Sequence, residues 1–168
     1  MTGMKYLNFA TKAASEVETH REPRIGHVHL RVADVERATN FYRDVLGFKV
    51  VCYGPTMGLP MAFLAAGDYH HHIALNAFDS KAGTPPPNGH TGLHHFAVLY
   101  PDLLSLSKVV GRVLECGLPL RHTRDHGATL SFYLQDPDGN EVELYYDRPP
   151  AHWLDLRVSQ SSNPSPSI

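Results

Sequence analysis

The chain has 168 residues, 42% of them hydrophobic and 19% charged, which excludes a disordered protein and fits one compact domain or two small packed halves. Its net charge of -2 leaves no excess of Lys and Arg for a nucleic acid or an anionic membrane surface, and no apolar run approaches the roughly 20 residues of a membrane-spanning helix. Cys52 and Cys116 form no CxxC pair and the first twenty residues lack a signal-peptide apolar core, so we expect a cytoplasmic protein with free thiols.

Residues 1–23 are mixed and polar, and we expect them to form an N-terminal arm. The stretch IGHVHLRVADVERATNFYRDVLGF then predicts a strand, an N-cap at Asp34 and a helix that ends at Gly47, because apolar residues recur at three- and four-residue steps after Asp34. Three apolar runs follow, FKVVCY, MAFLAA and HHIALN, and each predicts a strand. The segment GTPPPNGH is rich in residues that stop regular structure, so it predicts a linker.

The same order of elements recurs after the linker. GLHHFAVL predicts a strand, residues 101–117 a helix, and LPLRH, LSFYLQ and EVELYY three more strands, with a turn at DPDGN. The sequence therefore predicts an α+β fold of two paired βαβββ modules, residues 24–80 and 91–147 of a single domain over 24–147. The modules should form a curled mixed sheet around a cavity with the helices outside. Residues 148–168 should be a largely irregular tail.

Histidine is the compositional outlier, with twelve in this small chain. Side chains alternate between the two faces of a strand, so each apolar face implies an opposite polar one. The alternation, with HHHIALN taken as one strand, turns the following side chains toward the cavity: His27, His29, His70, His72, His95, Tyr133, Glu141 and Glu143. His71 and His94 should face the packing side or an edge. A face that merely meets water would prefer Lys, Glu, Thr and Ser, whereas this one repeats metal-binding residue types.

A candidate metal site emerges from three of these residues. His27, His95 and Glu143 come from three strands that paired modules would bring together. Two histidines and one carboxylate form the facial triad of non-haem Fe(II), which leaves positions open for ligands. Because neutral imidazoles and one carboxylate leave the site net positive, the triad favours an anionic bidentate substrate such as a catecholate.

From Ile25 to Asp147 the chain resembles the vicinal-oxygen-chelate superfamily of glyoxalases, bleomycin-resistance proteins and extradiol dioxygenases. IGHVHLRVADVERATNFYRDVLGF is similar to the opening signature of that superfamily, and DPDGNEVEL is similar to its closing one. The resemblance implies that His27, His95 and Glu143 are the metal ligands. Because superfamily members often dimerise, we also expect a homodimer.

Within that superfamily, LSFYLQDPDGNEVEL and YHHHIAL look like the compact extradiol dioxygenases with a single module pair. This resemblance implies cleavage of a catechol ring by O2 with Fe(II), or alternatively Mn(II), as cofactor. It implies that Tyr133 hydrogen-bonds the metal-bound substrate oxygen and that His72 is the acid-base residue. RHTRDH resembles the RHTNDH segment that borders the dioxygenase pocket, which implies substrate-binding roles for His122, Arg124 and His126, with Arg124 standing in place of the usual Asn.

Two other functions stay open. A glyoxalase-like isomerase or thiol transferase would use Ni, Zn or Mn on the same scaffold, but the resemblance places a glyoxalase carboxylate on the strand that here reads HHIALN. A metal-free protein that binds a planar aromatic drug would lack the ligand set. The roles of His29 and His70 are left open as well.

Overall fold

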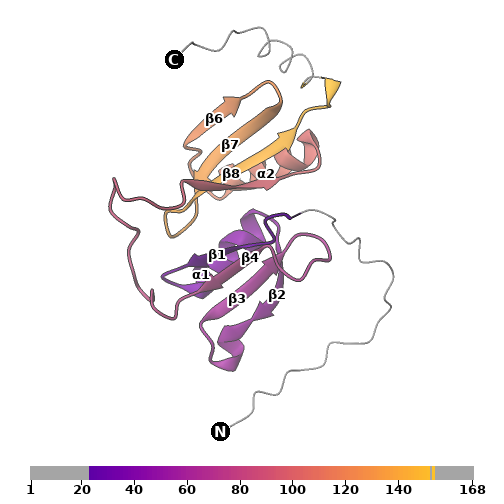
Figure 1. The fold of residues 1–168 in the computed structure, drawn as a ribbon. Helices are drawn as coiled ribbons and strands as arrows, with labels where there is room; N and C mark the ends of the chain where they lie inside the picture. The colour runs from indigo at the N-terminus through magenta and orange to yellow at the C-terminus, as the bar shows by residue number, and fades with distance from the viewer. Residues whose placement is uncertain (1–22, 152, 154–168) are drawn as a thin grey trace.

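The computed structural model describes residues 23–151 and 153 (Figure 1). The regular elements, in chain order, are β1 (Val28–Arg31), α1 (Val35–Asn40), β2 (Lys49–Tyr53), β3 (Met61–Ala65), β4 (Ile73–Asn76), β5 (His95–Leu99), α2 (Leu103–Glu115), β6 (His122–Asp125), β7 (Thr129–Gln135) and β8 (Glu141–Asp147). Nearly all of the expected N-terminal arm and most of the expected C-terminal tail lie outside the described residues. Among the described residues, no helix combines the length and apolar character that crossing a membrane requires.

Each half of the chain forms its own four-stranded mixed sheet, in the orders β1-β4-β3-β2 and β5-β8-β7-β6. In the first sheet β1 runs parallel to β4, and in the second sheet β5 runs parallel to β8. The other neighbouring strands are antiparallel. The predicted α+β class and the repeated βαβββ order are thus confirmed. In the described structure, however, no ladder joins β1 to β5, so the sheet is open between the modules. The domain limits 24–147, 24–80 and 91–147 remain our proposal.

The first helix differs from its prediction. Asp34 is the N-cap, since its side chain accepts a hydrogen bond from the Arg37 amide, but the α-helix ends at Asn40 and Phe41–Val45 continues as a π-helix. The wider π turn lets two consecutive aromatic side chains, Phe41 and Tyr42, both enter the core. Gly47 then ends the segment with φ of 87°, as the C-terminal glycine of the prediction requires.

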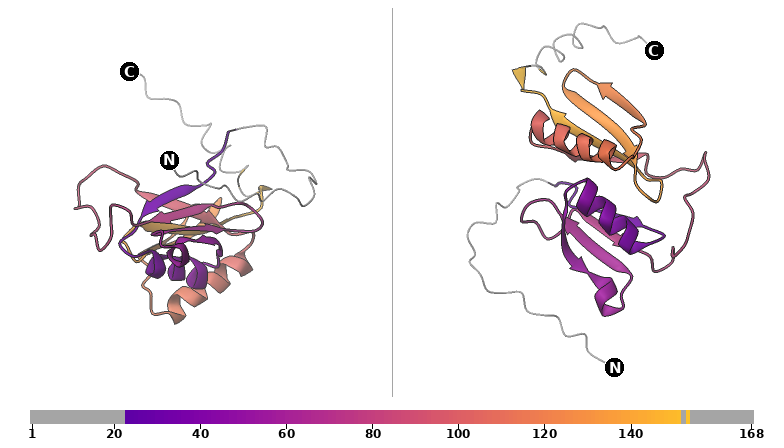
Figure 2. Two further views of the ribbon diagram at one scale, coloured as in Figure 1. Left: turned by 90° about the horizontal axis from the view of Figure 1, so that it is seen from below. Right: turned by 180° about the vertical axis from the view of Figure 1, so that it is seen from behind.

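A single apolar core holds the two modules together. Both helices lie on the same side of the two sheets (Figure 2). Leu106 and Val113 of α2 are completely buried in the same cluster as Val142 and Leu144 of β8 and residues of the first module, such as Tyr42. Because the apolar residues of the strands face the helices, the polar residues that alternate with them belong to the opposite faces of the sheets.

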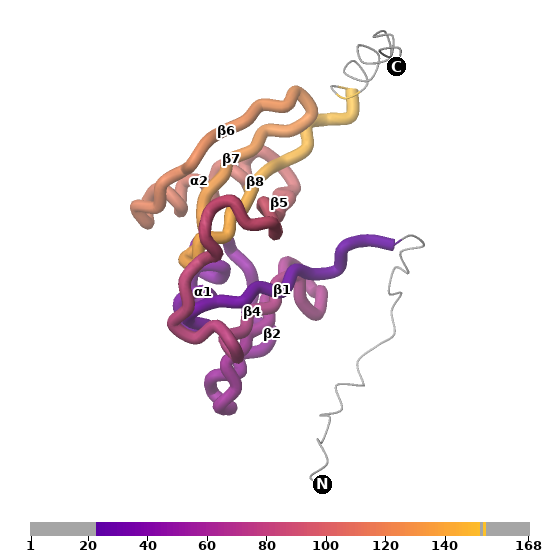
Figure 3. Tube along the Cα trace, turned by 60° about the vertical axis from the view of Figure 1, so that its left-hand side comes forward, coloured from indigo at the N-terminus to yellow at the C-terminus, as the bar shows by residue number. Residues whose placement is uncertain are grey.

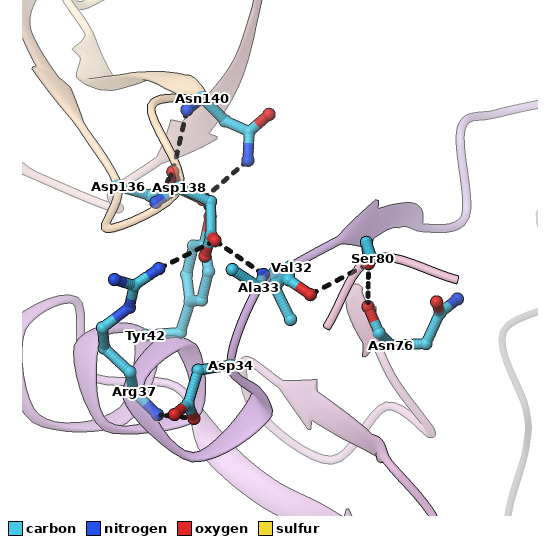
Figure 4. Close-up of polar contacts among 10 residues, drawn as sticks. All are labelled: Val32, Ala33, Asp34, Arg37, Tyr42, Asn76, Ser80, Asp136, Asp138 and Asn140. Atoms are coloured by element: carbon cyan, nitrogen blue, oxygen red, sulfur yellow. Dashed lines mark hydrogen bonds and ion pairs between the residues drawn. The ribbon is translucent and has the colours of Figure 1, made fainter. Parts of the chain in front are cut away.

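A polar junction ties the turn between β7 and β8 to the first module (Figure 4). Asp138 Oδ1 accepts hydrogen bonds from the Ala33 amide at 2.7 Å and from Arg37 Nη2 at 2.9 Å. The Tyr42 hydroxyl donates to Asp136 Oδ2 at 2.7 Å in a buried environment. Burial, reinforced by the Asp136 carboxylate, raises the pKa of Tyr42 well above its ordinary value of 10.0, so this hydroxyl stays a donor.

We expect Tyr42→Phe to lower the free energy of unfolding by about 1.5–3 kcal/mol, because it removes a buried hydrogen bond to a charged group. Asn140 Nδ2 also donates to Asp136 Oδ2, at 2.9 Å, so the carboxylate keeps one partner. Urea unfolding at pH 7 measures the loss, with Tyr146→Phe as the control because Tyr146 packs against the same core without being fully buried.

The pH dependence provides a second check on this hydrogen bond. A folded-state pKa raised above 10.0 means that the Tyr42 contribution is fully present below pH 10 and is lost as the pH rises above it, because the unfolded chain ionises first. The stability difference between the native protein and Tyr42→Phe should therefore shrink above pH 10. A difference that stays constant up to pH 11 would contradict the assignment.

Candidate active site

A cavity of about 820 Å³ lies between the two modules. One wall comes from the segment leading into β1 and from the starts of β1 and β4, and the other comes from β5 and the residues before it (Figure 3). Three imidazoles, His27, His72 and His95, reach this cavity, and most of the remaining lining is apolar, including Ile25 and Leu93. The junction between β1 and β5 therefore contains the cavity that the sequence predicts between the two modules.

His95, which lines the cavity, also belongs to a closely packed polar cluster of the second module. His95 Nε2 lies 3.1 Å from Glu143 Oε2, and the His95 ring meets the Tyr133 ring edge-on with centroids 5.6 Å apart. His122 stacks on Tyr133, with centroids 4.2 Å apart and an interplanar angle of 22°. Strand register explains the cluster, because Tyr133 is the direct partner of both Glu143 on β8 and His122 on β6.

Tyr133 is a neutral hydrogen-bond donor in this cluster. Its side chain is nearly buried, with 7% of the residue exposed. Burial, followed by the hydrogen bond to Glu143, raises the pKa of Tyr133 above its ordinary value of 10.0. The hydroxyl is therefore available as a donor to an oxygen atom next to Glu143.

The spacing of His95 and Glu143 fits a shared metal ion. Bonds of about 2.0–2.2 Å from one ion to an imidazole nitrogen and a carboxylate oxygen, set at right angles, would separate the two ligand atoms by about 3 Å. The observed separation of 3.1 Å matches that value. A soft-to-intermediate nitrogen and a hard oxygen together suit Fe(II), Mn(II) or Zn(II).

The wall from the first module corrects the prediction for the histidine triplet. Strand β4 begins only at Ile73, so His70, His71 and His72 lie in the irregular segment that precedes it. An irregular segment has no two-residue alternation, and His71 accordingly faces His27, with ring centroids 4.5 Å apart, instead of the packing side. His71 also stacks on Phe63, at 4.7 Å and 18°.

His72 is held firmly at the cavity by its backbone and its ring. Its amide donates to Leu64 O at 2.8 Å, its carbonyl accepts from the Val28 amide at 3.0 Å, and its Nδ1 accepts from the Ala66 amide at 3.2 Å. Burial, with the nearby Arg24 charge, lowers the pKa of His72 below its ordinary value of 6.5. His72 is therefore neutral at pH 7 and carries its proton on Nε2, since Nδ1 is the acceptor.

The structure brings two of the three predicted metal ligands together and leaves the third across the cavity. Among residues 23–151 and 153, the group of three metal-ligating side chains whose ligand atoms all lie within 4.8 Å of one another is His94, His95 and Glu141. His27 is not part of it and stays on the facing wall. The triad of His27, His95 and Glu143 thus remains a prediction that requires the two walls to approach.

The other predicted site residues differ in whether they contact the cluster around Tyr133. His122 reaches Tyr133, whereas Arg124 is an exposed residue further along β6 and His126 is exposed in the turn after it. His29 hydrogen-bonds Asn76, with Nε2 and Nδ2 2.8 Å apart, which accounts for one of the open histidines. His94, expected on the packing side or at an edge, is exposed just before the edge strand β5, where it lies beside His95.

Known proteins resemble this chain over most of its described residues. The model of the glyoxalase/bleomycin resistance protein/dioxygenase superfamily matches residues 24–144. The chain is 39% identical over 113 residues to the catechol-2,3-dioxygenase of Bacillus subtilis, an alignment that covers 67% of this chain and 37% of that protein. It is 36% identical over 127 residues to the biphenyl-2,3-diol 1,2-dioxygenase 3 of Rhodococcus globerulus, with 74% and 64% covered.

The chain thus spans about a third to two thirds of the length of these two relatives. A solved structure, the lactoylglutathione lyase from Agrobacterium tumefaciens, aligns with a TM-score of 0.57 at 25% identity over 75% of this chain and 95% of that one. Proteins named for different activities therefore resemble this chain over most of its length. Together, the matched residues and the repeated βαβββ order show that the chain belongs to the glyoxalase/bleomycin resistance protein/dioxygenase superfamily.

Proposed function

We propose that this protein is an Fe(II)-dependent extradiol dioxygenase that cleaves a catechol-type diol with O2. The observation that carries the proposal is the His95–Glu143 pair, 3.1 Å apart, with Tyr133 packed against His95, which itself lines the cavity. The similarity to a catechol dioxygenase and to a biphenyl-diol dioxygenase supports the same reaction class.

His95 and Glu143 would hold the metal together with His27, once the facing wall moves toward them; Mn(II) is the alternative ion. Bound there, Fe(II) would supply chelation of the two diol oxygens, which lowers their pKa, and electron transfer to O2. The donor set fits such an ion, because two imidazoles and one carboxylate on one side leave the other side open for substrate.

The other side chains of the cavity would bind the substrate and move its proton. Tyr133 would donate its hydroxyl to a substrate oxygen, with His122 stacked behind the phenol ring to hold it in place. His72 would offer its Nε2 proton to an oxygen of the substrate. To take up the substrate's proton at Nε2, His72 must first carry its own proton on Nδ1, and Nδ1 must then release the Ala66 amide.

The apolar lining would exclude water and face the aromatic ring of the diol. Substrate contacts by Arg124 and His126 are also proposed, although both residues are exposed here. Strand β4 reads IALN and carries no carboxylate, which favours the dioxygenase over a glyoxalase-like isomerase or thiol transferase with an acidic ligand on that strand. We also propose that the protein is cytoplasmic and forms a homodimer.

The proposed function is tested by purifying the protein without air, loading Fe(II), and adding catechols with oxygen. We expect stoichiometric iron and a yellow ring-opened product whose formation consumes one O2 per diol. The same protein loaded with Zn(II) should form no product, because Zn(II) has no redox chemistry. Absence of product from every catechol, with iron bound one to one, would instead favour the glyoxalase-like isomerase.

A further inference from the structure

His94 and Glu141 have no role in the proposed reaction, yet they form a group with His95, a ligand of the proposed iron site. His94 Nδ1 is 2.8 Å from His95 Nδ1 and 3.6 Å from Glu141 Oε2. The ligand atoms of the three residues all lie within 4.8 Å of one another. His94 is largely exposed, with 84% of its side chain accessible, whereas only 18% of the Glu141 side chain is accessible.

The fold explains why these residues meet. Strands β5 and β8 run parallel with His95 directly opposite Glu141, so the imidazole and this carboxylate are cross-strand neighbours. Glu143, two residues further along β8, lies on the same face as Glu141. His95 therefore stands between two carboxylates, with Nε2 directed to Glu143 and Nδ1 directed to the side of His94 and Glu141.

The spacing of His94, His95 and Glu141, which we call the outer group, suits a tetrahedral cation. Ligand atoms bound at about 2.0–2.1 Å to one tetrahedral ion lie about 3.3–3.4 Å apart. The separations of His94 Nδ1 from His95 Nδ1 and from Glu141 Oε2, 2.8 and 3.6 Å, bracket this value. Two imidazoles and one carboxylate are a common donor set for zinc, with a fourth position left to water. Without an ion, the short approach of two Nδ1 atoms requires a proton between them, and a cation would replace that proton.

We propose that His94, His95 and Glu141 form a second divalent-cation site, suited to Zn²⁺. This site competes with the proposed iron site, which contains Glu143, for the ligand His95. A neutral imidazole offers one nitrogen lone pair, so His95 serves either the outer cation through Nδ1 or the inner one through Nε2. Occupation of the outer site therefore withdraws one ligand from the proposed iron site. This inhibitory consequence rests on the proposed function, whereas cation binding itself does not.

Calorimetric titration with Zn²⁺ tests the site without any activity. The full chain carrying Glu143→Gln, which weakens the inner site, should bind one Zn²⁺. Adding His94→Ala or Glu141→Gln should weaken this binding at least about 10-fold, whereas adding Glu115→Gln on the exposed end of α2 should not. Equal Zn²⁺ affinity in all these proteins would overturn the proposal, provided that their circular dichroism spectra agree.

A second arm separates this proposal from the proposed function. If the iron-loaded protein cleaves a catechol, micromolar Zn²⁺ should inhibit it, and His94→Ala should raise the Zn²⁺ concentration needed at least about 10-fold. Inhibition at the same concentration in both proteins would contradict the competition for His95. If no catechol is cleaved, the proposed function fails, and the calorimetric result still decides whether the outer site exists.

Discussion

Glu143→Gln is expected to abolish ring cleavage by removing the metal. The amide that replaces the carboxylate is neutral and is a much weaker ligand. The affinity for Fe(II) should therefore fall by at least about 100-fold. This loss exceeds the one expected for a residue that only hydrogen-bonds a ligand. Turnover at saturating diol should fall below about 1% of the native value for the same reason. Iron content after gel filtration and initial rates of product formation measure the two effects.

Two controls make this result specific. Glu115→Gln removes the same charge from the exposed end of α2 and should leave iron content and turnover at native values. Glu141→Gln changes a carboxylate on the same face of β8, two residues before Glu143. Loss of iron in Glu141→Gln with retention in Glu143→Gln would reverse the assignment, and the iron ligand would then be sought in the group of His94, His95 and Glu141.

His72→Phe is expected to slow turnover by about 10²–10⁴-fold while leaving iron bound, because that is the usual contribution of a positioned acid-base group. Phenylalanine keeps the planar ring that packs on Tyr69, at a centroid distance of 4.7 Å, but it offers no proton and cannot accept from the Ala66 amide. Stopped-flow measurement under saturating diol and O2 separates this slow step from substrate binding.

The matched control is His70→Phe, since His70 is an exposed member of the same segment. It should retain native turnover and native iron content. The pH profile gives a further test, because burial lowers the pKa of His72 below its ordinary value of 6.5, so the residue is neutral at pH 7. Loss of iron from His72→Phe would make His72 a metal ligand, and an unchanged rate would remove it from the mechanism.

Local patterns in the sequence were sufficient to predict the modules and the contents of their strands. The apolar period of two places Leu30 in the core and leaves His29 on the opposite face, where it reaches Asn76. The same argument is correct for β7 and β8, because a strand of seven residues has a regular alternation and well-defined neighbours. Tyr133 and Glu143 therefore lie on one face, as the sequence predicted, and the register of β7 and β8 makes them direct partners.

Tertiary structure decided what the alternation could not. The histidine triplet lies in an irregular segment, where side-chain direction follows the local backbone, so His71 turned toward His27. The orientation of His94 depends on the parallel pairing of β5 with β8, a contact between segments 46 residues apart (141 − 95 = 46). The junction between β1 and β5 likewise depends on how two separate sheets pack.

The sequence by itself determined the fold class and the repeat, and it placed His95, Tyr133 and Glu143 on one face of their strands, because these follow from periodicity along the chain. Only the tertiary structure decided that His27 lies across a cavity from its expected partners and that His95 stands between two carboxylates. The physical reason is that distances between modules are set by packing of the shared core, which no local pattern of residues encodes.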